Sequence, residues 1–480
     1  MFAAYPFKVE LHVQFWTHSR TRSVRFTRLV NTFFYIALVI DTLYINMPDI
    51  DINCYPRLKE NGPQLIANIA QFQTTLTELS ITLLSRDDVH EQQILSSFPN
   101  LTHLTMLFGY LGIEVTQGNA DHVCNTAANL LYLHLDNMHS FESRINPILR
   151  RAPKLKALII SNHRNKRLYD SHMSADFAPI FTMCPQLRYV AWKETRPLTR
   201  TRTYDPWKQY VQQPNDDDNT TGLNLRELIF YGGTEEQASA GHIIRQAQER
   251  LEYLELLGPP NDKTTIANVR LPRLKALHLN GLKINQDEWM SFVMGCPRLE
   301  ELGIYALLTS MDLNAILQSA RSLKHLRQLE LINFGHNIGD QTSLDNLCEV
   351  LSTTRLRSLN LRDIPISDQG LLNLCNIQSL RELRLSMRGY DEYITHNGLL
   401  AFANKQKAAK NQLHSLDFWW ISSMSDTVLE RLGQVNGLKA LSVGCARHIT
   451  DSGVEMFIES GKKLRVTNCA SLSRHSFSRK

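Results

Sequence analysis

The sequence contains no C-x-x-C pair, and its eight cysteines form no tight cluster. Without such spacing, the chain is not expected to hold a structural zinc ion. Unpaired cysteines pack as small hydrophobic side chains and belong to reducing compartments. We therefore expect an intracellular protein of the cytoplasm or nucleus, in which the sequons at Asn100 and Asn219 stay unglycosylated.

Long apolar runs and a strong charge imbalance are also missing. The longest apolar run lies between Asn31 and Asp41, and its nine residues fall far short of the roughly 20 that a membrane-spanning helix needs. The net charge of +5 is spread over 480 residues, which is too diffuse to favour nucleic-acid binding. With 43% hydrophobic and 21% charged residues, the composition is that of an ordered, soluble protein.

Motifs that carry catalysis are absent as well. The sequence has no G-x-S-x-G, no phosphate-binding G-x-x-x-x-G-K-[ST] and no H-E-x-x-H. Its 17 histidines are scattered, and none stands in a recognisable order with a cysteine or serine. We therefore predict a protein that is not an enzyme and that uses no cofactor or metal.

The sequence does contain one short motif, L-x-x-L-x-L, which is repeated along almost the whole chain, and each copy is called a phrase below. The first position of successive copies is Leu76, Leu101, Leu130, Leu155, Leu187, Leu225, Leu251, Leu274, Leu299, Leu326, Leu356, Leu380, Leu413 and Leu438. A weaker copy, Ile40-x-x-Leu43-x-Ile45, is expected to start the series, and Leu464-Arg465-Val466 to end it. Most copies are roughly 23 to 33 residues apart, a period typical of leucine-rich repeats. Units this small cannot bury their apolar face alone, so they must stack into a solenoid.

The segments between the phrases show helical spacing. Trp289, Phe292 and Val293 follow i, i+3, i+4, the pattern of one helix face. The same face is indicated by Leu344, Leu347, Cys348 and Leu351. Several helices are expected to open with a hydroxyl that caps the free amides and an aspartate that suits the positive helix end. These pairs are Ser367-Asp368, Ser425-Asp426 and Thr450-Asp451.

Together these features predict an α/β leucine-rich-repeat solenoid, a horseshoe with parallel strands on its concave side and helices on its convex side. The repeats are expected to span residues 38–470. A basic N-terminal segment, 1–37, precedes them, and a basic polar tail, 471–480, follows them. A fold of this kind offers an open surface for a protein partner and no enclosed reaction pocket.

The largest break in the period runs from Lys193 to Leu223. This segment is too long and polar for a standard return, so we predict an inserted surface loop. Two interpretations remain open: a tolerated flexible insertion, or a flap that binds a partner through Arg200, Arg202 and Trp207.

Within each phrase the leucines should point into the core and the alternating residues onto the concave face. In the C-terminal repeats these alternating residues are Gly303 and Tyr305, Glu330 and Ile332, Asn360 and Arg362, Arg384 and Ser386, Asp417 and Trp419. Arg362, Arg384, Asp417 and Trp419 are therefore expected to form one patch, to which Tyr305 is added as a further partner-binding candidate. One interpretation is an ion-pair ladder that solvates the face. The other is a site that holds an acidic or aromatic segment of a partner.

The sequences of several repeats resemble the cysteine-containing leucine-rich repeats of F-box proteins. The phrases that carry this resemblance are Gly295-Cys296-Pro297-Arg298-Leu299-Glu300-Glu301-Leu302, Leu441-x-Val443-x-Cys445-x-x-x-Ile449-Thr450-Asp451-x-Gly453, Ile366-Ser367-Asp368-x-Gly370-Leu371 and Ile394-Thr395-His396-x-Gly398-Leu399. An F-box begins with a Leu-Pro pair, for which Tyr5-Pro6-Phe7 is the nearest match, so segment 1–37 is interpreted as a truncated or degenerate F-box remnant or as a cap.

The resemblance implies a substrate-recognition subunit of a cullin-type (SCF) ubiquitin ligase, acting in ubiquitin-dependent protein degradation. Its partners would be a protein substrate, the ligase adaptor and the cullin, with the chain a monomer within that complex. The alternative is a free-standing protein-interaction scaffold without a ubiquitin link.

Overall fold

The structure is a computed structural model of the chain, which divides into two compact units, Met1–Leu225 and Arg226–Lys480. It describes residues 49–53, 77–83, 100–108, 127–136, 146, 148–161, 178–194, 207–212, 223–231, 234–257, 266, 268–280, 286–306, 315–316, 319–333, 348–390, 392–408 and 413–467. The predicted segments 1–37 and 471–480 and the weak phrase at 40–45 lie outside these residues.

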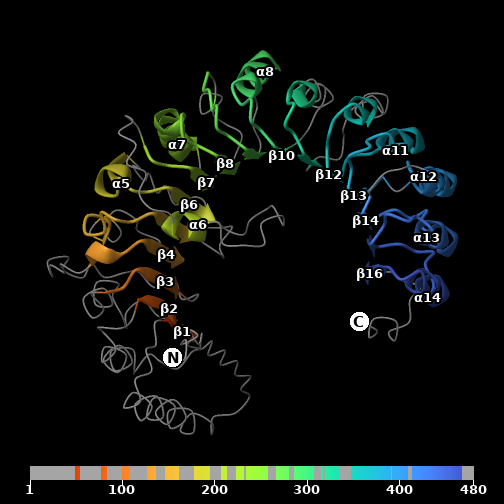
Figure 1. Cartoon of the computed structure of the whole chain (residues 1–480), viewed down its shortest axis with the longest axis horizontal. Helices are drawn as coiled ribbons and strands as arrows, with labels where there is room; N and C mark the ends of the chain where they lie inside the picture. Colours follow the sequence, from red (N-terminus) through yellow and green to blue (C-terminus); the bar gives the residue numbers. More distant parts are fainter. Residues whose placement is uncertain are drawn as a thin grey trace, which may run out of the picture. The chain divides into compact units, whose positions relative to one another are not determined.

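The first unit is a row of parallel strands in chain order (Figure 1). Its strands are β1 (Asp49–Asn53), β2 (Glu78–Leu83), β3 (His103–Phe108), β4 (Tyr132–Asp136), β5 (Ala157–Ser161) and β6 (Tyr189–Glu194). Its helical segments are η3 (Ala127–Asn129), α5 (Ala178–Met183) and α6 (Trp207–Gln212). In Figure 1, α5 lies outside this row and α6 lies on its inner side.

The second unit repeats the same arrangement over more repeats. Its strands are β7 (Glu227–Tyr231), β8 (Tyr253–Leu257), β9 (Ala276–Asn280), β10 (Glu301–Ala306), β11 (Gln328–Asn333), β12 (Ser358–Arg362), β13 (Glu382–Ser386), β14 (Ser415–Trp419), β15 (Ala440–Gly444) and β16 (Lys463–Thr467). Its helices are α7 (Thr234–Ala247), α8 (Gln286–Met294), α11 (Asp368–Leu374), α12 (His396–Ala408), α13 (Asp426–Gly433) and α14 (Asp451–Glu459), which lie on the outer side of the strands (Figure 1). Among the residues described, no helix is long and apolar enough to cross a membrane.

The fold class is therefore confirmed: this is an α/β leucine-rich-repeat solenoid with parallel concave strands and convex helices. Each predicted phrase from Leu76 to Leu438 yields one strand, β2 to β15, and the worn phrase at Leu464 yields β16. The sequence reading missed β1, whose phrase is Met47-x-x-Ile50-x-Ile52 and contains no leucine. Register partners such as Leu359, Leu383 and Leu416 stack in the core, each at most 1% exposed.

Ser367 and Ser425 cap their helices as predicted, whereas the Thr450 side chain makes no cap hydrogen bond. The aspartates after the two serines connect one repeat to the next. Asp368 begins α11, and its carboxylate accepts hydrogen bonds from the backbone N–H (2.8 Å) and the hydroxyl (2.6 Å) of Thr395, one repeat later. Asp426 holds Thr450 in the same way, at 2.8 and 2.6 Å. A Cβ at Gly398 or Gly453 would overlap the aspartate of the preceding repeat. Each of these carboxylates links its repeat to the next, where a glycine leaves room for it, and we call these links the carboxylate ladder.

Candidate functional site

The candidate site is built on the concave side of β12, β13 and β14. The register places Arg384 beside Asp417, and it places Ser386 between Arg362 and Trp419. Because neighbouring strands lie about 4.8 Å apart, these side chains leave the sheet close to one another.

The indole of Trp419 is held from two sides. Its Nε1–H donates to Asp417 Oδ1 over 2.6 Å, and the ring lies across Gly444 on β15, where a Cβ would overlap it. Glycine at position 444 is therefore required by the close approach of the ring. The half-buried indole presents a fixed, flat apolar surface on the concave side of the C-terminal repeats.

The two arginines do not form a ladder with Asp417. Arg362 Nε lies 3.8 Å from Asp363 Oδ2, and Arg384 Nη2 lies 3.8 Å from Glu382 Oε2. Within the described part of the chain these are their only ion pairs, and the side chains are 59% and 37% exposed. Exposed pairs at this distance contribute little stability, and neither guanidinium group makes a further hydrogen bond among the described residues.

Two residues that the sequence reading missed extend this surface. Trp420 follows β14 with a left-handed φ of 59°, and its side chain is 43% exposed. The Arg388 guanidinium lies 5.8 Å from the centroid of that ring, a cation–π arrangement. The pair Trp419-Trp420 was the sequence signal for the exposed Trp420, because the residue directly after a strand turns its side chain towards the edge of the sheet. We call Arg362, Arg384, Arg388, Asp417, Trp419 and Trp420 the C-terminal concave patch.

Tyr305, which was also predicted to bind a partner, is fully buried. Its hydroxyl donates to Glu330 Oε2 over 2.7 Å and lies 3.1 Å from His278 Nδ1. Burial, together with the Glu330 carboxylate, raises the pKa of Tyr305 far above its ordinary value. The ring therefore belongs to the framework of the face and is set apart from the exposed patch.

This framework is a cluster of rings and carboxylates on β8 to β11. His278, only 1% exposed, lies between the rings of Tyr253 and Tyr305, with centroid distances of 5.5 and 6.1 Å. A Cβ at Gly303 would overlap His278, so glycine lets the imidazole cross its strand. The cluster holds the concave side of β8 to β11 in place.

The inserted segment is only partly described. Arg200 and Arg202 lie outside the described residues, and Trp207 begins α6. Tyr210 and Val211 of α6 are buried, and Lys156 Nζ donates to the Val211 carbonyl over 3.4 Å. The concave residues of β5, Ala157, Ile159 and Ser161, are buried too. Residues 207–212 are thus packed on the sheet and do not form a free loop.

The pKa of His103 on β3 depends on the position of α6. Burial, followed by the positive charge of Lys208 on α6, lowers the pKa of His103 to about 4, although Glu78 Oε1 lies 3.6 Å from Nδ1. Because the folded state binds this proton less well than the unfolded chain, protonation of His103 opposes folding, and the stability of the fold decreases as the pH falls from 6.5 towards 4.

We predict that Lys208→Gln raises the pKa of His103 from about 4 towards 6.5, because it removes a like charge while leaving the burial in place. The measurement is an NMR titration of histidine-labelled protein. Lys154→Gln is the matched control, because Lys154 bonds to Asn129 on the exposed surface. An unchanged His103 titration in Lys208→Gln would contradict the placement of the Lys208 charge near His103.

The described cysteines form no disulfide bonds with one another. Burial raises the pKa of Cys184 and of Cys296 to about 12 and that of Cys375 to about 11. Cys184 and Cys296 instead fill the position where each repeat turns from helix to strand, as small apolar side chains.

Comparison with known proteins yields similar folds only. No protein-family model matches the sequence, and no curated protein matches it significantly. An internalin (inlF) from Listeria monocytogenes is 17% identical with a TM-score of 0.40, over 86% of this chain and 94% of that chain. A chain of the Rad7–Elc1 complex from yeast is 15% identical with a TM-score of 0.40, over 93% and 98%. The function must therefore be argued from this chain's own residues.

Proposed function

We propose that this chain is a non-catalytic protein-binding module whose C-terminal concave patch captures an acidic or aromatic segment of a partner. The observation that carries the proposal is that the two arginines of the patch are exposed and do not pair with Asp417. Asp417 accepts from the Trp419 indole, while Arg362 and Arg384 keep exposed guanidinium groups beside it. The patch therefore offers unused donors next to a fixed aromatic surface, a composition typical of interface hot spots.

The chemistry of the patch limits its ligand. A guanidinium group holds a carboxylate through two parallel hydrogen bonds, and the neighbouring indoles accept an apolar or aromatic side chain. A segment with alternating acidic and aromatic residues would match both features along the row from β12 to β14. Neutral polar or basic segments would leave the arginines unpaired and are expected to bind poorly.

We further propose that captured proteins are substrates of a cullin-type ubiquitin ligase, with this chain as the recognition subunit. Support for this step comes from the resemblance of the repeat phrases to F-box proteins. The alternative is a free-standing interaction scaffold without a ubiquitin link.

Affinity purification of the full chain from its own cells separates these two functions. Stoichiometric recovery of the adaptor and cullin subunits is the result expected for a ligase subunit. If a partner is retained through the patch but adaptor and cullin are absent, the scaffold function replaces the ligase function. If Arg362→Glu/Arg384→Glu retains every partner at wild-type level, the patch is not the binding site and the proposal fails.

A further inference from the structure

A row of basic residues runs along the edge of the second unit where its strands begin. The residues directly before β11, β12, β13, β14 and β15 are Arg327, Arg357, Arg381, His414 and Lys439. Each backbone N–H from Arg357 onward donates to the carbonyl of the previous member, over 2.7 to 2.8 Å. The five side chains therefore start from adjacent positions about 4.8 Å apart. We call this row the basic edge.

The same row is neutralised in the preceding repeats. There it alternates in sign through Arg226, Glu252, Lys275 and Glu300. Glu252 accepts from Arg226 over 2.9 Å and from Lys275 over 2.6 Å. Arg327 lies 3.8 Å from Glu300, and after Arg327 no acidic residue occupies a position in the row up to Lys439. Ion pairs can therefore form along this edge, as they do in the earlier repeats. In the C-terminal repeats the row contains no acidic residue with which its basic residues could pair.

The accumulated charge affects the histidine within the row. Desolvation, followed by the charges of Lys439 and Arg381, lowers the pKa of His414, and Glu382 only partly opposes them. A line of like charges at this spacing is unfavourable unless an anion binds to it. The basic edge therefore has the electrostatics of an anion site.

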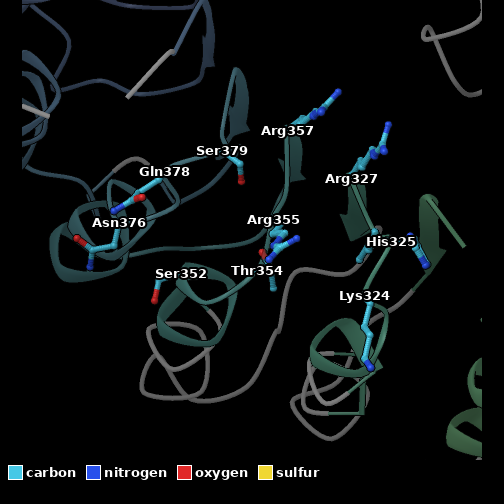
Figure 2. Close-up of a pocket in the computed structure, with 11 residues that line it drawn as sticks. Lys324, His325, Arg327, Ser352, Thr354, Arg355, Arg357, Asn376, Gln378 and Ser379 are labelled. Carbon is cyan, nitrogen blue, oxygen red and sulfur yellow. The ribbon is translucent and has the colours of Figure 1, made fainter. Parts of the chain in front are cut away.

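A groove of about 900 Å³ lies beside the start of the basic edge. It is lined by Lys324, His325, Arg327, Arg355 and Arg357, with polar side chains on its other walls and no Phe, Tyr, Trp or carboxylate among its described lining residues. Figure 2 shows Arg327 and Arg357 extending side by side from neighbouring strands. Arg327 and Arg357 thus belong both to the groove and to the basic edge.

These cations are not used to complete the helices that end nearby. Terminal helical carbonyls accept instead from neutral hydroxyls: Ser352 donates to the Glu349 carbonyl (2.6 Å), and Thr354 to the Leu351 carbonyl (2.7 Å). Among the described residues, Lys324, Arg355 and Arg357 have neither an ion pair nor a hydrogen bond from their side chains. Their donors remain available to a ligand.

We propose that this groove and the basic edge bind a phosphorylated peptide segment of a protein partner. Arginine forks match the oxygens of a phosphate monoester, whose charge near −2 exceeds that of a carboxylate. Arg355 and Arg357 are the primary phosphate ligands, and Arg327 with Arg381 follows the peptide along the edge. This surface is separate from the concave patch, so it does not depend on the function proposed for that patch.

A peptide fits these features better than a nucleic acid. Proteins that bind single strands stack bases on aromatic side chains, and the described lining of this groove has none. The basic edge is also a single line of charge on a chain of net charge +5, without the broad basic face that follows a duplex.

The test measures binding of the full chain to fluorescein-labelled probes by anisotropy. The main probe is a Gly-Ser-rich peptide with two phosphoserines at alternate positions, and the comparison probes are its unphosphorylated form and a single-stranded oligonucleotide. Arg355→Gln/Arg357→Gln should weaken binding of the phosphopeptide about tenfold or more, because charge-assisted hydrogen bonds are lost. Arg273→Gln/Arg298→Gln removes the same charge from exposed turns of earlier repeats and should change this binding less than about twofold.

Selective binding of the phosphopeptide, competed by inorganic phosphate more strongly than by chloride at equal ionic strength, would support the proposal. Tighter binding of the oligonucleotide through the same arginines would overturn it in favour of nucleic acid. Absence of binding to all probes, or equal loss in both double variants, would also overturn it. None of these outcomes decides the function of the concave patch, which has its own variants.

Discussion

Replacing Gly453 by alanine should destabilise the C-terminal repeats by about 3 kcal/mol, although alanine is the better helix former. The added Cβ would overlap the Asp426 carboxylate, which has to move. Moving it breaks two charge-assisted hydrogen bonds to Thr450, of 2.8 and 2.6 Å, that link one repeat to the next. Urea unfolding followed by circular dichroism measures the change, and hydrogen exchange in α14 shows where it acts.

The neighbouring helix supplies a matched control. Gly433 ends α13, and a Cβ there would lie at an ordinary 3.4 Å from Ser460 Oγ. Gly433→Ala should therefore leave stability unchanged or raise it by up to about 1 kcal/mol. A double-mutant cycle with Asp426→Ala completes the design, because Gly453→Ala should cost little once the carboxylate is gone. If Gly453→Ala is as harmless as Gly433→Ala, the carboxylate ladder does not stabilise the stack.

The course of the strands was predictable because the signal is local. Each L-x-x-L-x-L phrase places apolar side chains on one side of one strand, and stacking needs only that neighbours do the same. β1 escaped detection because Ile50 and Ile52 replace the leucines, although β-branched residues suit a strand as well. The carboxylate ladder was only half predicted. Asp368 was expected to favour its own helix end, but its hydrogen-bond partner is Thr395, 27 residues away.

The site was harder to predict, because exposure depends on neighbours in other repeats. Alternation alone placed Tyr305 and Arg362 on the same concave face. Tyr305 is nevertheless buried, and its hydroxyl contacts His278 and Glu330, which are 27 and 25 residues distant. Likewise, the pairing of Asp417 with Trp419 instead of Arg384 follows from side-chain geometry that no spacing rule contains. The predicted insertion contains a packed helix, which is anchored by the buried residues Tyr210 and Val211. The sequence did not predict it because these two residues lie within a largely polar segment.

Reversing the charge of Arg362 and Arg384 together should weaken capture of the partner by at least about 100-fold. Glutamates at these positions would face an acidic ligand with like charge and would add to the charge of Asp417 beside it. Stability should change by no more than about 1 kcal/mol, because both side chains are exposed and their ion pairs are long. The measurements are the dissociation constant for the retained partner by calorimetry and the urea midpoint of the same samples.

Two further variants separate recognition by the patch from a change in overall charge. Arg273→Glu/Arg298→Glu introduces the same four units of negative charge at exposed turns of earlier repeats, and binding should stay within about threefold. Arg362→Lys/Arg384→Lys keeps the charge but loses the two-pronged hydrogen bonds, so an intermediate loss is expected. If both reversals weaken capture equally, the partner senses only net charge. If the lysine variant binds as wild type does, the ligand makes no bidentate contact, and the acidic group is held by charge alone.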